Sequence, residues 1–338
     1  MGKYTAIGGQ ALIEGILMKS PEKTALAVRK PDGEIDISFM SGKSIRERVL
    51  ILKLPILRGI AGFVESMIQG YRAMMISAEK SGFADLEEEK KTEKAENPPK
   101  KSQSNALMNT VMIIGSVLGV ALAMVLFMLV PSLIADGLAW IFRTEFSPVV
   151  ISSIEQFIKL AVFVLYVWLV TFMKDIRRVF MYHGAEHKTI FCYEKGLPLT
   201  VENVRRQTRF HPRCGTSFMI LMILVSLLFS IAVQLIFPGV RRIVWLWVIV
   251  KILMIPLICG AGFEVLRICG KYDNIWTRIV SAPGLWMQRI TTKEPEDDMI
   301  EIAIASLRAC EPATPDVDRS IDQQETPDGE NNDDAEHL

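Results

Sequence analysis

The amino-acid sequence predicts a mainly α-helical, polytopic membrane protein with four transmembrane helices, a small N-terminal β-rich unit and flanking amphipathic helices. Half of the 338 residues are hydrophobic, and they concentrate in four long blocks. Such blocks match the roughly 20 apolar residues that a helix needs to cross a bilayer. Basic and acidic residues balance at 38 each, so charge is informative only through its position along the chain. We expect the lipid bilayer as a partner, membrane proteins as further candidate partners, and no nucleic acid.

Residues 1–43 are expected to form the small β-rich unit, which we place in the cytoplasm. The segments TALAVRK and EIDISF flank a Pro-Asp-Gly sequence at 31–33, and two short β-prone runs around turn residues are typical of a hairpin. The earlier segment GGQALIEGILMKSP opens with paired glycines, which permit tight turns or a close backbone approach. The unit is either a structural cap or a unit in which Gln10 and Glu14 face a site. No cleavable signal peptide is expected at its start.

Residues 44–83 are expected to form an amphipathic helix at the membrane surface or beneath the bundle. Apolar residues recur there at helical steps: Ile56, Ile60, Phe63, Met67 and Met74. Charged residues lie among them, so the segment is too polar for a clean span, and Gly59, Gly62 and Gly70 would allow close helix packing. Residues 84–107 are rich in Glu and Lys and are expected to be a disordered linker, because they cannot bury enough apolar surface to fold.

Residues 108–263 are expected to hold the four spans, at Met108–Val130, Val149–Met173, Thr216–Phe237 and Ile243–Gly262. Pro131 is expected to end the first span. Two charges, Glu155 in the second span and Lys251 in the fourth, lie about 10 and 13 Å from the outer ends of their helices at 1.5 Å per residue. A charge within a span is costly and usually has a partner, so we predict that the two pair. The alternative is that Glu155 lies at the interface while Lys251 extends outward.

The orientation of the spans follows from basic residues in short loops, which favour the cytoplasmic side. The stretch 174–213 carries nine basic residues, whereas 131–148 carries Arg143 alone. Arg241 and Arg242, in the turn after the third span, are a weaker contrary signal. We therefore expect a multi-pass protein of the bacterial cell membrane, with both termini and the 174–213 stretch in the cytoplasm.

Residues 264–311 are expected to hold an interfacial helix and a C-terminal amphipathic helix. The segment 275–290 carries Trp276 and Trp286 among apolar and basic residues, which suits an interfacial helix with aromatic anchors. TTKEPEDDM then reads as a helix start. The helix that follows has an apolar stripe formed by Ile300, Ala303, Ile304 and Leu307. Residues 312–338 are acidic and nearly without large hydrophobic side chains, so a disordered tail is expected.

Three of the four histidines fall in two short clusters on the cytoplasmic side. In HGAEHKTI, His183 and His187 are four residues apart, so a helix places both imidazoles on one face and offers two nitrogen ligands to one metal. Glu186 completes the pattern His-x-x-Glu-His of the inverted zincin motif. In those enzymes both histidines bind zinc and the glutamate acts on the metal-bound water. The match covers five residues.

The second cluster, HPRCG, lies at the start of the third span, on the same side of the membrane. Its imidazole and thiol are both good zinc ligands. We therefore predict a zinc site formed by His183, His187, His211 and Cys214. If all four bind, the metal is closed in and structural; if His211 or Cys214 stays out, one position is open to water and Glu186 could serve as a catalytic base. The alternative is that the histidines cap helices or contact lipid phosphates beside the arginines.

Four segments resemble motifs of the YqhQ-like family of bacterial integral membrane proteins: GGQALIEGILMKSP, YHGAEHKTIFCYE, RFHPRCGTSF and TTKEPEDDMIEIAI. They spread from Gly8 to Ile304, so the resemblance covers nearly the whole chain outside the linker and tail. The family is a domain of unknown function and a predicted metal-dependent enzyme, and the resemblance implies no more about activity. Glu14 and Glu264 enter as further positions of interest without an assigned role.

Two classes of function follow as alternatives. The first is a membrane-embedded, metal-dependent hydrolase that acts at the cytoplasmic face. The second is a non-enzymatic scaffold or membrane-protein assembly factor, in which any metal is structural. A transporter is less favoured, because the sequence shows no inverted repeat and a single strongly placed intramembrane charge, Lys251. The five cysteines have no regular spacing, and no disulfide framework is expected.

Overall fold

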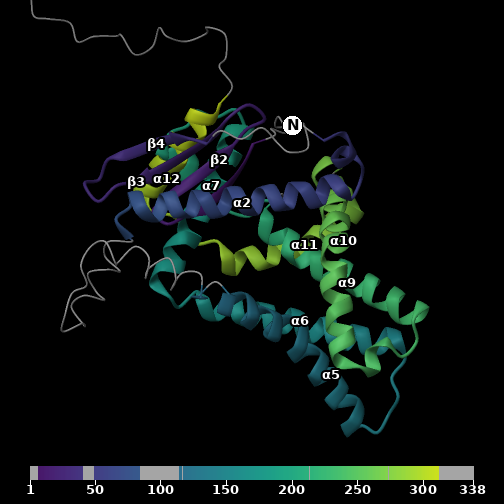
Figure 1. Ribbon diagram of the computed structural model, residues 1–338. Coiled ribbons are helices and arrows are strands. Elements are labelled where there is room, and N and C mark those ends of the chain that lie inside the picture. The colour runs from purple at the N-terminus through teal and green to yellow at the C-terminus, as the bar shows by residue number, and fades with distance from the viewer. Residues whose placement is uncertain are drawn as a thin grey trace, which may run out of the picture.

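The computed structural model describes residues 7–40, 49–83, 114–115, 117–212, 214–272 and 274–311. The linker expected at 84–107 and the tail expected at 312–338 lie outside these residues, as do the first residues of the first expected span. Within the described residues the chain is mainly helical, with a small sheet near the N-terminus and four helices long and apolar enough to cross a membrane (Figure 1). The predicted fold class is confirmed.

Four antiparallel strands form the sheet in the order β1-β2-β3-β4, with bounds Gly8–Leu12, Gly15–Lys19, Thr24–Arg29 and Ile35–Phe39. The predicted hairpin is the β3–β4 pair, in which Arg29 lies opposite Ile35. Gly33 in its turn has a φ of 89°, which favours glycine. A second hairpin joins β1 to β2 through Glu14, whose φ of 49° is uncommon for a residue with a side chain.

Helices cover both faces of the sheet (Figure 1). On one face, Leu17 and Leu26 pack in a cluster with Ala73 of α2 (Leu57–Lys80). On the other face, β2 and β3 pack against α12 (Asp297–Cys310), with α7 (Lys174–Glu194) beside it. This burial on two sides explains why β2 is a continuous apolar run rather than an alternating strand.

The apolar stripe predicted on the last helix is present on α12 and is buried. It covers the sheet rather than a membrane surface, since its residues share one core cluster with Ile16 and Ala25. The Ser306 hydroxyl lies 3.0 Å from the Ile16 carbonyl oxygen and 3.1 Å from that of Ala25, so a polar side chain in this buried face has acceptors on two strands. The sheet and the end of the chain therefore form one packed unit.

The four candidate spans are Val117–Ile141, Pro148–Val170, Phe218–Ile236 and Val244–Cys269. The last three belong to α6 (Pro148–Val170), α9 (Gly215–Ile236) and α10 (Val244–Lys271), in agreement with the predicted blocks. Helix α10 begins where expected and continues past Gly262. Its extra turns bring the end of the fourth span up to the layer that contains α2 (Figure 1).

The expectation that Pro131 ends the first span is wrong. The chain forms a π-helical turn, η2 (Val125–Leu129), and continues as α5 (Val130–Ile141). A π turn shifts the hydrogen-bond pattern by one residue, so the helix can pass a residue that has no N–H to donate. The connection to α6 therefore shortens to residues 142–147, and Gly137 lies inside the span.

The remaining elements are η1 (Leu50–Lys53), α8 (Val201–Arg205), η3 (Val240–Arg242) and α11 (Ile275–Thr291). Helix α11 packs along α9 and buries Met287 in a cluster with Phe163 and Ile220. Its two tryptophans, Trp276 and Trp286, are 73% and 52% exposed, and their role as aromatic anchors at the membrane interface stays a prediction.

Helix α2 runs from the sheet to α10 (Figure 1). A Cβ atom on Gly59 would lie 2.9 Å from the carbonyl oxygen of Gly260, so the two helices approach closely at these glycines, as predicted for Gly59. Beside them the Arg58 guanidinium donates to both carboxylate oxygens of Glu264, at 2.6 and 2.5 Å. Glu264 thus forms an ion pair that holds α2 against the end of the fourth span.

The predicted pair between Glu155 and Lys251 is present. The Lys251 ammonium donates to the Glu155 carboxylate and, at 2.7 Å, to the hydroxyl of Ser132. Glu155 also accepts from the Arg241 guanidinium and from the Trp247 indole N–H at 3.3 Å. The alternative in which Lys251 extends outward is wrong, because this carboxylate and hydroxyl hold its ammonium inside the bundle.

Candidate metal centre

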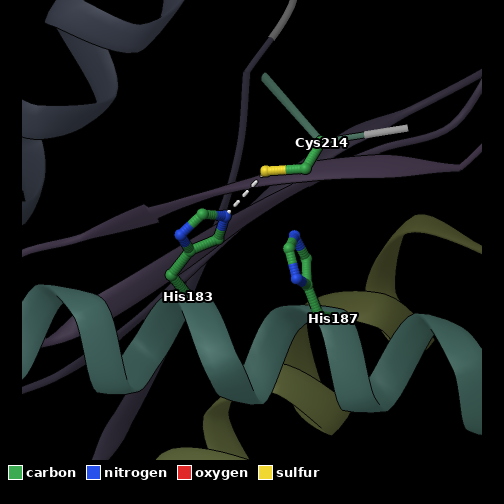
Figure 2. Close-up of side chains that lie close together, drawn as sticks. All are labelled: His183, His187 and Cys214. Carbon is green, nitrogen blue, oxygen red and sulfur yellow. Dashed lines mark hydrogen bonds between the residues drawn. The ribbon is translucent and has the colours of Figure 1, made fainter. Parts of the chain in front are cut away.

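Helix α7 begins directly after the second span and carries the HGAEHKTI segment in its second half. His183 and His187 project from the same face of this helix, as the four-residue spacing predicts (Figure 2). Their ring centroids are 4.4 Å apart. His187 is almost fully buried, whereas His183 is half-buried.

Each histidine ring is oriented by a backbone carbonyl. His183 Nδ1 lies 2.9 Å from the carbonyl oxygen of Thr291, at the end of α11, and His187 Nδ1 lies 2.5 Å from that of Arg209. A carbonyl oxygen can only accept, so each Nδ1 carries a hydrogen, and the neutral form of either ring has its Nε2 lone pair on the other side. The tautomers that a metal requires are therefore set before any ion binds.

Cys214 directly precedes α9 and brings a thiol to the open side of both rings (Figure 2). Its Sγ lies 3.1 Å from His183 Nε2, and the ligand atoms of His183, His187 and Cys214 all lie within 4.8 Å of one another. Cys214 as a whole residue is 7% exposed. Two imidazole nitrogens and one sulfur, buried and convergent, are a donor set that fits zinc.

The electrostatic environment keeps the more buried ring neutral. Burial lowers the pKa of His187, while its interaction with the Cys214 thiol opposes the shift. A neutral imidazole is the form that binds a metal. The ring is thus held in the ligating protonation state as well as in the ligating orientation.

His211, the fourth predicted ligand, lies outside this group. Its Nε2 is 3.7 Å from a carboxylate oxygen of Glu194, and its ring packs against Phe191 with centroids 4.7 Å apart. The backbone of His211 is held by Gln288, whose side chain accepts from its N–H and donates to its carbonyl, both at 2.7 Å. His211 is adjacent to the centre, with its ring centroid 5.5 Å from that of His187, but the structure brings together only three of the four predicted side chains.

Glu186 points from α7 toward strand β1. The Gly9 amide donates to its carboxylate, and a Cβ atom on Gly9 would lie 2.9 Å from both Cγ and Oε1 of Glu186. Burial raises the pKa of Glu186 to about 7, although the neighbouring His183 opposes this shift. Of the paired glycines near the N-terminus, Gly9 therefore serves a close approach, both to this carboxylate and to the backbone carbonyl oxygen of Leu17 at 2.9 Å, whereas a Cβ atom on Gly8 would meet nothing within 4 Å.

Glu14, in the β1–β2 turn, connects the same hairpin to α7. Its carboxylate accepts from Arg178 at 2.5 and 2.7 Å and from the Tyr182 hydroxyl at 3.0 Å. Burial acts to raise the pKa of Glu14, but the bonds from Arg178 and Tyr182 outweigh it and the pKa is lowered. These bonds place β1 over Glu186, so Glu14 supports the centre without facing it, while Gln10 packs against Gly70 of α2.

The glycine of the HGAEH segment allows another segment to cross α7. A Cβ atom on Gly184 would overlap the carbonyl oxygen of Lys293, and the Lys293 N–H donates to the Phe180 carbonyl at 2.9 Å. The crossing segment carries Thr291, which orients His183, and Glu294, which pairs with Lys188 and with Arg209, both at 2.6 Å. The TTKEPEDDM stretch therefore does more than begin the last helix.

A family model described as a protein of unknown function, DUF1385, matches residues 54–313. The chain belongs to the DUF1385 family. A curated relative from Bacillus subtilis (strain 168), described as uncharacterized protein YqhQ, is 37% identical over 303 residues, which cover 89% of this chain and 91% of the relative. No solved structure matches the chain. The predicted YqhQ-like resemblance is confirmed, and neither comparison names a metal or an activity.

The DUF1385 match includes all three convergent side chains and the groups that orient them. The sequence predicts the ligand candidates. It does not predict the carbonyls of Thr291 and Arg209, or the two hydrogen bonds between the Gln288 side chain and the His211 backbone. Backbone groups leave no residue-type signal. The one available signal for a role of Thr291 was the polar TTKE stretch, which directly follows the predicted interfacial helix.

Proposed function

We propose that this DUF1385 protein is an integral protein of the bacterial cell membrane that binds one zinc ion through His183, His187 and Cys214 and uses it in hydrolysis. The observation that carries this proposal is the convergence of three ligand atoms whose two histidines are already held in the ligating tautomer by carbonyls. Three protein ligands leave a fourth position open, which is the arrangement of catalytic rather than structural zinc.

Zinc bound there would supply a Lewis acid for a hydrolytic reaction. The chain's own contribution is to hold the ligands, exclude bulk water by burial and provide a carboxylate beside the centre. Glu186, one residue from His187 and kept in place by the Gly9 amide, would take up and return a proton at its carboxylate oxygen. We propose it as the general base on these grounds.

The proposed orientation places this centre and both termini in the cytoplasm. The basic residues of 174–213, on the side of the bundle that carries the centre, support it, whereas the opposite connection at 142–147 holds Arg143 as its single basic residue. The reducing environment of the cytoplasm would also keep the Cys214 thiol available as a ligand.

Metal analysis of the purified protein tests the zinc proposal. The expected result is one zinc per chain, lost on Cys214→Ser or on joint replacement of His183 and His187 by Ala. Cys192→Ser is the matched control, because Cys192 is a buried cysteine on α7 that lies outside the ligand group. His211→Gln should keep its zinc; loss in that variant would support the four-ligand site predicted from the sequence. Stoichiometric zinc in the double histidine variant would refute the centre.

A structural metal in a scaffold is the second candidate, and one observation favours it. The ligands come from α7 and from the start of α9, so an ion would hold the sheet-bearing unit to the transmembrane bundle. Glu186→Gln separates the two candidates because Glu186 is not in the ligand group. Under the hydrolase proposal the variant keeps zinc and fold and loses function in cells. Full complementation by a folded, zinc-loaded variant would instead favour the scaffold.

A further inference from the structure

A cavity of about 330 Å³ lies within the transmembrane bundle, between η2, α6, α9 and α10. Its wall is mainly apolar and rich in methionine and aromatic side chains, among them Phe163, Met222 and Met254. Unbranched, polarizable methionine side chains adapt to flexible hydrocarbon. Three further lining residues, Tyr166, Met219 and Ile255, are 47%, 50% and 37% exposed, so the cavity opens sideways toward the lipid.

The wall contains two lysines, which are Lys251 and Lys159. Lys159 lies 11 residues after Pro148, the first residue of α6, or about 16 Å along the helix at 1.5 Å per residue. That depth is near the middle of a bilayer core of about 30 Å, where a lysine costs roughly 2.5–3.5 kcal/mol on insertion scales. Such a residue usually has a partner or a route to water.

Within the described residues, the Lys159 ammonium makes no hydrogen bond and no ion pair. Its nearest carboxylate in the helix, Glu155 one turn away, already accepts from Lys251 and Arg241. Three cations therefore surround this carboxylate, and Asp136, which pairs with Arg241, supplies the second negative charge of the cluster. One positive charge in this cluster is therefore left uncompensated. Both Lys159 and Lys251 line the cavity, and Lys159 is the one that has no carboxylate of its own.

Two hydroxyls, those of Ser226 and Ser230, line the same space, and the Ser226 hydroxyl already donates to the Gln156 side chain at 2.8 Å. The Ser230 hydroxyl oxygen accepts from Gln156 at 3.5 Å, which leaves its own hydrogen to donate to a further acceptor. Lys251 already donates to the Met128 carbonyl, to Ser132 and to Glu155. The mainly apolar wall therefore offers a ligand one ammonium, that of Lys159, and one hydroxyl donor, that of Ser230. Such a wall suits a ligand with a single anionic group and a hydrocarbon body. A carboxylate is the monoanion that one ammonium balances.

We propose that this cavity binds a single-chain acyl carboxylate, such as a long-chain fatty acid, with the carboxylate on Lys159 and the chain along the methionine-rich wall. The site is independent of the zinc centre. The residues that line it include none of His183, His187 and Cys214. Failure of one proposal therefore leaves the other unchanged.

Equilibrium binding of radiolabelled palmitate to the full-length protein in nanodiscs of zwitterionic lipid tests the proposal. Saturable binding near one palmitate per chain is expected, with unlabelled palmitate competing and methyl palmitate failing to compete. Lys159→Met should weaken binding about tenfold or more, because a charge-assisted bond is lost. Lys159→Arg should retain binding. Lys174→Met, at the start of α7 and away from the cavity, is the matched control.

Met222→Trp gives a second test that does not alter charge, since the larger side chain fills the cavity. It should abolish palmitate binding while zinc content stays unchanged. Three results would overturn the proposal: no saturable binding to the wild-type protein, equal competition by the methyl ester, or wild-type affinity in a folded Lys159→Met variant. Competition by lysophosphatidic acid with equal potency would assign the site to a phosphate head group and also overturn the carboxylate proposal.

Discussion

Replacing Gly184 with alanine should disrupt the junction on which the metal centre depends. Inside an exposed helix, Gly→Ala normally stabilises by about 0.5–1 kcal/mol. At this position the new methyl group would overlap the Lys293 carbonyl oxygen and lie 3.2 Å from the carbonyl carbon. Neither atom belongs to a flexible side chain, so the crossing segment must move away from α7. Overpacking of this kind costs about 1–3 kcal/mol.

The matched control is Gly137→Ala in α5, where a Cβ atom would meet nothing within 4 Å. Taking the propensity gain at Gly137 and the overpacking loss at Gly184 together, the two variants should differ in unfolding free energy by roughly 1.5–4 kcal/mol. Unfolding in mixed detergent and denaturant, followed by tryptophan fluorescence, measures the difference. Gly184→Ala should also lower zinc affinity, because Thr291 moves with Lys293 and no longer orients His183. Equal stability of the two variants would show that Lys293 does not pack against Gly184 of α7.

Three further predictions address other parts of the chain. Breaking the buried pair by Glu155→Gln or Lys251→Met should cost about 3–5 kcal/mol each in unfolding free energy, with a double-mutant coupling of roughly 1–3 kcal/mol; additive effects would show that the two do not interact. Reporter fusions at Glu145 and Gly196, in connections on opposite sides of the bundle, should report opposite sides of the membrane, and the same side for both would reject the topology. The pKa of Glu14 is lower in the folded than in the unfolded protein, so its carboxylate stabilises the fold at pH values above the unfolded value near 4.5, and this stabilisation is lost as the pH falls through the folded value. Glu14→Gln should therefore lower the free energy of unfolding at pH 7 and change it little in acid. Urea titrations of both proteins at the two pH values measure this difference.

The spans could be predicted because their signal is local. Runs of apolar residues long enough to cross a bilayer have few alternatives, and three of the four blocks match their helices within a few residues except for the longer end of α10. The first block failed at Pro131, since the rule that proline ends a helix assumes regular α-helical hydrogen bonding. The π turn before Pro131 breaks that regular bonding, and no residue type in VLFML predicts a π turn.

The partners of the amphipathic faces could not be predicted. The stripe on α12 shows that one face is buried but not what covers it, and the answer is a sheet about 290 residues earlier, as the Ser306 bond to Ile16 shows. The same limit applies to the site. His183 and His187 follow from helical spacing, whereas His211 was included for its residue type and its place at the start of the third span, on the same side of the membrane. Its orientation depends on Gln288 and Glu194, two side chains that no spacing rule connects to it.

The position of the centre determines which experiment can reveal its role. Its ligands lie on α7 and at the start of α9, and the carbonyls that orient them belong to Arg209 and Thr291. An ion bound there joins two stretches of chain that are separate in sequence, α7 and the residue before α9, so its removal should destabilise the protein whether the metal is catalytic or structural. Loss of stability on chelation therefore cannot distinguish a hydrolase from a scaffold. Glu186 can, because it contacts Gly9 and lies outside the ligand group, so replacing its carboxylate changes the proposed chemistry while leaving the metal-held junction intact.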